Sequence, residues 1–146
     1  MKLSDFVIKF LEQKKIDTVF TVSGGGSIFL CDALYKAKKI KYISCHHEQA
    51  VSYATESYSR FKNKPGAAIV TTGPGGTNAV SGVAACWIDS VPAIFISGQV
   101  FLNQTIGNSK QLGNILCLPQ IQDSLAARKL VCARISDGVF LQEVLF

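Results

Sequence analysis

The side chains best suited to chemistry stand together in this sequence, in the run Cys45, His46, His47 and Glu48. The run follows a short apolar stretch and opens a segment with helical spacing, which predicts Glu48 at a helix N-terminus beside the end of a strand. Open α/β sheets place their chemistry at the carboxyl ends of parallel strands. The helix dipole favours a carboxylate there by about 0.3–1 kcal/mol. Position alone favours the simpler interpretation, a first-turn glutamate that only supports its helix.

Two neighbouring histidines and a cysteine suggest a metal site only at first sight. Adjacent residues on an extended stretch point to opposite faces, so His46 and His47 cannot easily share one ion. A hydrogen-bonding or packing role is the better interpretation, and we predict no metal ligand here. Asp89 is a candidate catalytic acid, but its place before a Ser-Val-Pro turn is more typical of a residue that ends a helix.

Two glycine-rich turns, at residues 23–27 and 72–76, each lie between an expected strand and an expected helix. Glycine lets a ligand approach the backbone, and a helix N-terminus presents free N–H groups. Neither turn matches the dinucleotide fingerprint or the phosphate-loop motif, so each alone is better explained as structural. Pro74 fixes φ and has no N–H, which predicts a rigid, apolar shelf in the second turn. Such a shelf suits stacking against a planar ring better than holding a phosphate.

The elements that position these residues alternate along the chain. Apolar periodicity predicts helices at 4–14, 28–38, 48–61 and 77–88, with Ser4 as the cap of the first, and strands at 17–22, 40–45, 67–71 and 93–97. The connections are short, which indicates an α/β fold with one doubly wound, mainly parallel sheet and helices on both faces. The pattern then weakens, and we expect a loop at 101–113, a helix at 119–130 and a strand at 131–135.

Composition narrows the class of protein. The chain has 146 residues, 48% apolar and 17% charged, which suits one globular domain. Its five cysteines are widely spaced without a Cys-x-x-Cys pair, so we expect a reduced, cytoplasmic protein with neither a disulfide framework nor a zinc cluster. The net charge of +5 comes from scattered lysines and arginines, and we expect no nucleic-acid face. No signal peptide and no apolar run of about 18 residues is present, so we expect no membrane span.

Five short motifs occur in order and with natural spacing: His47-Glu48-Gln49-Ala50, Tyr58-Ser59-Arg60, the run from Thr71 to Asn78, Asp89-Ser90-Val91-Pro92 and Ser97-Gly98-Gln99. Together they resemble the N-terminal pyrimidine-binding domain of thiamine-diphosphate enzymes, in particular the acetolactate synthase-like group. The resemblance runs from about Leu3 to Gly107. Each motif is weak alone, but five in register are specific for the superfamily, though not for a substrate.

The resemblance implies that Glu48 is the catalytic residue. It matches the family's glutamate, which hydrogen-bonds the ring nitrogen N1′ of the cofactor's aminopyrimidine. A proton shared there favours the imino tautomer of the pyrimidine, whose nitrogen removes a proton from the thiazolium ring. The resulting ylid is the carbanion chemistry that thiamine supplies. With this resemblance, a cofactor contact becomes the better interpretation of Glu48.

The same resemblance implies further cofactor-binding residues. Pro74 and Asn78 match positions that hold the aminopyrimidine ring. Gly24 and Gly25 match the turn that lies near cofactor and substrate. The family's Phe-Gln-Glu run has its nearest equivalent at Gln111, which we include as a candidate.

The family resemblance ends at residue 113. The family binds the diphosphate and its Mg²⁺ with a separate domain, through a Gly-Asp-Gly motif and a downstream Asn-Asn pair, and neither that domain nor the central domain is recognisable here. We therefore predict a pyrimidine-binding domain at 1–113 and a divergent tail at 114–146 that completes it or is appended to it. We expect a truncated product with an altered reading frame after about residue 113, inactive alone. Its expected partners are a diphosphate-binding domain or subunit and a second copy, in a homodimer through the pyrimidine domain.

Three functions follow from the resemblance and stay open at this point. The first is part of an acetolactate synthase-like transferase or lyase, which forms or cleaves C–C bonds of 2-keto acids. The second is a separate α-subunit of a two-subunit thiamine-diphosphate decarboxylase. The third is a non-catalytic binding module with a degenerate pocket, against which the intact Glu48, Pro74 and Asn78 speak.

Overall fold

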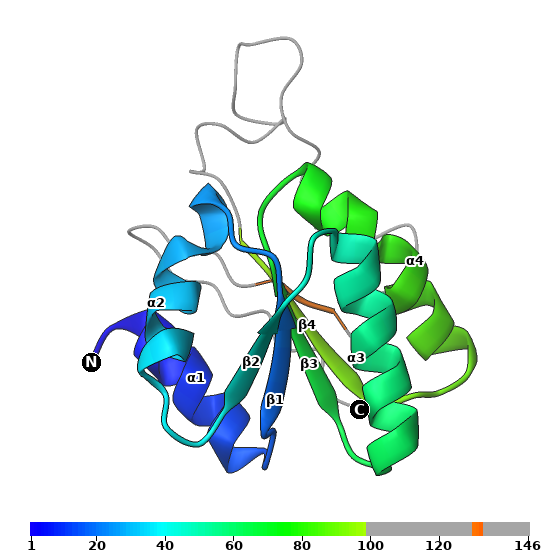
Figure 1. Ribbon diagram of the computed structural model, residues 1–146, viewed down its shortest axis with the longest axis horizontal. Coiled ribbons are helices and arrows are strands. Elements are labelled where there is room, and N and C mark those ends of the chain that lie inside the picture. Colours follow the sequence, from blue (N-terminus) through cyan, green and yellow to red (C-terminus); the bar gives the residue numbers. More distant parts are fainter. Residues whose placement is uncertain (99–129, 133–146) are drawn as a thin grey trace, which may run out of the picture.

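A computed structural model describes residues 1–98 and 130–132 of the chain, and these form one parallel α/β sheet with its helices (Figure 1). The strands are β1 (Thr18–Thr21), β2 (Lys41–Ser44), β3 (Gly66–Val70), β4 (Ala93–Ser97) and β5 (Leu130–Cys132), in the spatial order β2-β1-β3-β4-β5. The helices are α1 (Leu3–Gln13), α2 (Ile28–Lys36), α3 (Glu48–Lys62) and α4 (Pro74–Ile88), and a short 3₁₀ turn, η1 (Gly25–Ser27), leads into α2. All four described strand pairs are parallel.

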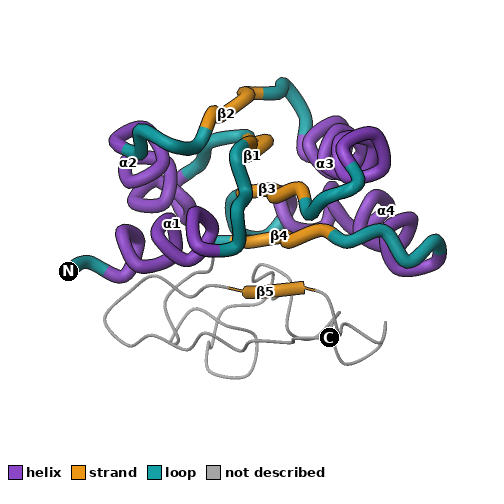
Figure 2. The backbone as a smooth tube through the Cα atoms, turned by 90° about the horizontal axis from the view of Figure 1, so that it is seen from below, coloured by secondary structure: helices purple, strands orange, loops and turns teal. Residues whose placement is uncertain are grey.

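The sheet is buried between two helical layers, with α1 and α2 on one face and α3 and α4 on the other (Figure 2). Successive residues of the central strands alternate between the two cores: Val19 and Ile69 join the cluster under α1 and α2, whereas Phe20 and Val70 join the cluster under α3 and α4. All five residues of β3 are buried, as expected for a central parallel strand covered on both sides. The predicted doubly wound α/β fold is confirmed.

Two helix starts differ from the sequence prediction. The predicted cap Ser4 is wrong, because α1 already begins at Leu3 and Ser4 is buried inside its first turn. Lys2 takes the N-cap position, and its backbone N–H donates to Asp5 Oδ2 at 3.3 Å. Helix α4 begins at Pro74, three residues earlier than predicted, because a proline at the first helical position has the required φ and its missing N–H costs nothing there.

The last predicted elements are tested only at β5. This strand, Leu130–Cys132, pairs with β4 and starts one residue before the predicted strand at 131–135. Leu130 was predicted to be the last residue of the helix at 119–130, but it is the first residue of β5. The predicted loop at 101–113, the rest of that helix and the domain boundary at residue 113 lie outside the described residues. No helix among the described residues is long and apolar enough to cross a membrane.

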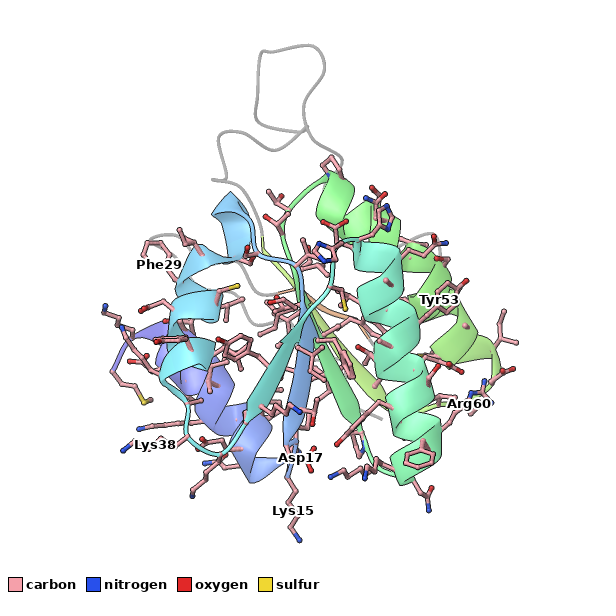
Figure 3. The ribbon with its side chains drawn as sticks, in the orientation of Figure 1. Lys15, Asp17, Phe29, Lys38, Tyr53 and Arg60 are labelled. Atoms are coloured by element: carbon pink, nitrogen blue, oxygen red, sulfur yellow. The ribbon has the colours of Figure 1, made fainter. Side chains whose placement is uncertain are left out.

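The amino edge of the sheet is stabilised by a hydrogen bond and an ion pair of Asp17. Asp17, just before β1, accepts a hydrogen bond from the hydroxyl of Tyr58 on α3 and forms an ion pair with Lys64. The hydrogen bonds from Lys64 and then Tyr58 lower the pKa of Asp17 from 3.8 to about 2. These contacts tie the start of β1 to the end of α3, at the edge opposite the one where the helices α2, α3 and α4 begin (Figure 3).

Replacing Asp17→Asn should make stability less dependent on pH. A carboxyl whose pKa is depressed on folding stabilises the native state above its unfolded pKa, and this stabilisation is lost as the pH falls through the folded pKa. The free energy of unfolding of the native chain should therefore exceed that of the variant by about 1 kcal/mol at neutral pH. This figure is discounted because half of the Asp17 side chain is exposed. The difference should vanish between about pH 4 and pH 2 in urea unfolding. As a control, Asp32→Asn removes an exposed i,i+4 pair and should change stability by no more than about 0.5 kcal/mol. A difference between native and Asp17→Asn that persists at pH 2 would contradict this role.

Candidate functional site

Glu48 is the first residue of α3, at the carboxyl edge of the sheet where the sequence places it. His47 precedes it as the N-cap, with an extended backbone, and its Nδ1 accepts the N–H of Gln49 at 3.1 Å. This bond satisfies one of the free N–H groups of the first helical turn. His47 thus has the hydrogen-bonding role predicted from the sequence.

The carboxyl of Glu48 is oriented by a residue from the next helix. Asn78, in the second turn of α4, donates from Nδ2 to Glu48 Oε2 at 3.1 Å, and both side chains are half-buried. A side chain on Gly75 would put its Cβ 3.3 Å from Glu48 Oε1, so this glycine leaves room beside the carboxyl. Within residues 1–98 and 130–132, Oε1 makes no hydrogen bond. Asn78 therefore fixes one oxygen of Glu48, and no described residue donates to the other.

This pairing requires that α3 and α4 pack closely. A Cβ on Gly82 would lie only 2.3 Å from Ser52 Oγ, so a side chain there would push the helices apart. Gly75 and Gly82 are seven residues apart and share one face of α4. Gln49 Nε2 also donates to Ser81 Oγ at 3.2 Å, which adds a second bond between the helices near the site.

Asp89 lies at the other end of the same helix pair. It caps the C-terminus of α4 and pairs with Arg60, which also pairs with Glu56 on α3. The 15 residues of α4 separate Asp89 from the start of that helix by about 22 Å. The interpretation of Asp89 as a helix-ending residue is confirmed, and it is not part of the site around Glu48.

Thr71, directly after β3, holds the two glycine turns together. Its Oγ1 accepts the N–H of Gly26 at 3.1 Å, and its carbonyl accepts the hydroxyl of Ser97 at 3.0 Å. A Cβ on Gly24 would lie 2.5 Å from the Thr71 side chain, and one on Gly75 would lie 2.7 Å from it. Thr71 opens one of the five sequence motifs, but no role was predicted for it. Its only signal is a threonine between a buried strand and a glycine turn.

The two glycines and the proline among the remaining predicted site residues have different structural roles. Gly24 needs to be glycine because Thr71 fills the space beside it, whereas a Cβ on Gly25 would meet nothing within 4 Å. Pro74 is exposed at the start of α4, where it fixes the helix that carries Asn78. Gln111 lies outside the described residues.

The described side chains at the site offer hydrogen bonding. Cys45 is half-buried, and burial raises the pKa of its thiol, which disfavours the reactive thiolate. No three His, Cys, Asp or Glu side chains are grouped for a metal within the described part of the chain. The oriented Glu48 carboxyl, beside a rigid glycine-lined backbone, can accept an N–H or share a proton with a ring nitrogen.

Comparison with known proteins identifies similar sequences. The model of the family described as "Thiamine pyrophosphate enzyme, N-terminal TPP binding domain" matches residues 1–115. The chloroplastic acetolactate synthase 3 of Brassica napus is 42% identical over 99 residues, which are 68% of this chain and 15% of that protein. The acetolactate synthase large subunit of Haemophilus influenzae is 33% identical over 128 residues, which are 86% of this chain and 22% of that protein. The chain thus spans only about a fifth or less of the relatives it matches.

Replacing Thr71→Val should free the Gly26 amide. Valine keeps the shape of threonine but cannot accept the Gly26 N–H, and the loss should cost about 1–2 kcal/mol of stability. Thr71→Ser keeps the hydroxyl and serves as the matched control. Native-state hydrogen exchange should show the Gly26 amide exchanging about tenfold faster in the valine variant and nearly unchanged in the serine variant. Equal protection in both variants would show that Thr71 does not hold the turn.

Proposed function

Since this chain belongs to the thiamine pyrophosphate enzyme family, we propose that it binds the aminopyrimidine ring of thiamine diphosphate at Glu48 and Asn78. The observation that carries the proposal is the 3.1 Å hydrogen bond from Asn78 Nδ2 to Glu48 Oε2. It fixes a carboxyl at the carboxyl edge of the sheet with its second oxygen available. Such an oxygen can share a proton with a ring nitrogen of the pyrimidine.

The shape of the surrounding backbone fits a planar ring. Gly75 leaves the space beside Glu48 Oε1 free of a side chain, and Gly25 faces open space. Pro74 gives the start of α4 a rigid, apolar surface. These features support Gly24, Gly25 and Pro74 as parts of the cofactor site, with Gln111 as a further candidate from the resemblance.

In this proposal each residue has a simple physical task. Bound thiamine diphosphate would supply a thiazolium ring that can bond to the carbonyl carbon of a 2-keto acid and stabilise negative charge on that carbon. Glu48 would hold a proton between Oε1 and the ring nitrogen, and Asn78 would keep the carboxyl from rotating. Thr71 would keep the two glycine turns at a fixed separation.

The reaction we propose is that of an acetolactate synthase-like enzyme acting on 2-keto acids, forming or cleaving a C–C bond. Relatives named acetolactate synthase support it, and because the chain spans 15% to 22% of them, the diphosphate and Mg²⁺ are assigned to a further domain or subunit. A separate α-subunit is the second candidate, supported by the two helical layers that cover the described sheet. The chain alone should be inactive in either case.

The outer surface of α3 and α4 suits such a partner. Helix α4 has no charged residue, and Tyr53, Trp87 and Ile88 are exposed on the two helices, with Tyr53 pointing away from the sheet (Figure 3). By contrast, α1 carries exposed lysines such as Lys9 on its outer side. We propose that the diphosphate-binding partner, or a second copy in a homodimer, covers the α3–α4 surface.

The aminopyrimidine half of thiamine, as its free hydroxymethyl derivative, tests the site without the missing diphosphate contacts. The chain should bind it weakly, and Glu48→Gln should lower the affinity about tenfold to a hundredfold, because a hydrogen bond to a charged group is lost. Glu12→Gln, on the opposite layer, should leave the affinity unchanged. Thiamine diphosphate with Mg²⁺ should bind the isolated chain weakly too. Tight binding that survives Glu48→Gln, by titration calorimetry, would contradict the proposal.

Alanine substitutions at Gly24 and Gly25 distinguish a folding role from a binding role. Gly24→Ala places a methyl group against Thr71 and should destabilise the chain by about 1–3 kcal/mol. The methyl group added by Gly25→Ala points into open space, so this substitution should change stability by less than about 0.5 kcal/mol. It should nevertheless weaken binding of the aminopyrimidine. Unchanged affinity in a stably folded Gly25→Ala chain would remove Gly25 from the site.

A further inference from the structure

Strand β2 forms an edge of the sheet, with β1 on one side and no described strand on the other (Figure 2). Its first two residues and its last are exposed. The N–H of Lys41 donates to Asp17 O at 2.8 Å, and the N–H of Cys45 donates to Thr21 O at 2.9 Å. Because alternate residues of a strand turn their backbone groups to opposite sides, the N–H and C=O groups of Tyr42 and Ser44 point away from β1. They are positioned to pair with an added strand.

Two exposed tyrosines lie beside this edge. The rings of Tyr42 on β2 and Tyr35 on α2 are 6.4 Å apart between centroids, and their residues are 44% and 73% exposed. Each ring combines a large apolar face with a polar tip, which is typical of residues that contact partners. A strand lying along β2 would place every second side chain on the face of the sheet that carries this aromatic pair.

The beginning of β2 is positively charged. Lys38, Lys39 and Lys41 are exposed, and none of them has an ion pair among residues 1–98 and 130–132. Lys15 from the neighbouring α1–β1 connection lies at the same edge of the molecule as Lys38 (Figure 3). The beginning of β2 therefore attracts carboxylates, and it lies at the amino edge of the sheet, opposite the carboxyl edge that carries Glu48.

We propose that the β2 edge binds an extended, acidic peptide segment of a partner protein by strand addition. The outward backbone groups of Tyr42 and Ser44 would pair with the peptide backbone, and carboxylates would lie near the three lysines. A second copy fits less well, since each chain has a net charge of +5 and presents the same lysines. A nucleic acid fits less well too, because a phosphodiester chain cannot match alternating N–H and C=O groups. The proposal does not depend on thiamine binding.

A fluorescein-labelled peptide of alternating Glu and Val is the probe, and its Lys–Val counterpart is the control, each measured by anisotropy with the full chain. The acidic peptide should bind, and its affinity should fall at least about fivefold when the salt concentration rises from about 0.05 M to about 0.5 M. Ser44→Pro removes an outward N–H without breaking a bond to β1, so it should abolish binding, whereas Ser44→Ala should not. Circular dichroism checks that both variants fold.

Charge is tested by two triple variants of equal net charge. Lys38→Glu/Lys39→Glu/Lys41→Glu should lower the affinity at least about tenfold, while Lys2→Glu/Lys9→Glu/Lys62→Glu should change it much less. Equal losses in the two triples, or equal binding by Ser44→Pro and Ser44→Ala, would overturn the proposal. So would no binding of the acidic peptide, or its displacement by single-stranded DNA. Sedimentation that shows self-association lost in Ser44→Pro would assign the edge to a second copy instead.

Discussion

The site depends on one hydrogen bond between two helices, from Asn78 Nδ2 to Glu48 Oε2. A typical hydrogen bond contributes about 0.5–1.5 kcal/mol to stability, but here its geometric effect matters more. It stops the carboxyl from rotating and leaves Oε1 in a defined place. The bond exists only because α3 and α4 approach closely, and Gly75 and Gly82 allow that approach by having no side chain. Any residue with a Cβ at Gly82 would meet Ser52 and separate the two partners of the bond.

The contacts that stabilise the fold and the proposed ligand site lie at opposite edges of the sheet. Asp17 joins Tyr58 and Lys64 at the amino edge, and Arg60 joins Asp89 at the far end of the α3–α4 pair. These contacts hold the end of α3, while His47, as its N-cap, fixes where it begins. Because a parallel sheet directs all its helix N-termini to one edge, the carboxyl edge can combine free N–H groups with Glu48. The β2 edge, where we propose that a partner peptide binds, lies to the side of both groups.

Local sequence patterns predicted the structural features that depend on residues close together in the sequence. The alternation of strands and helices, the position of Glu48 at a helix start and the helix-ending role of Asp89 all follow from periodicity and turn chemistry, and the structure agrees. The role of Thr71 could not be predicted in this way, because its hydrogen bond joins Gly26 to a residue 45 positions away. The start of α4 was misplaced because Pro74 was interpreted as a turn residue, although proline fits the first helical position equally well. That Glu48 and Asn78 belong to one site was implied only by the family resemblance, and their hydrogen bond was not predicted, since nothing local connects α3 to α4.

The most direct test of the site observes the Glu48 carboxyl itself. Carbon-13 NMR of the side-chain carboxyl can be followed in the folded chain while the free aminopyrimidine is added. The Glu48 resonance should shift with saturable dependence on the ligand, together with the Gly25 and Gly75 amides, whereas Asp17 at the opposite edge should not respond. A Glu48 signal that stays unchanged while the ligand perturbs other parts of the chain would contradict the assignment of this carboxyl to the pyrimidine ring.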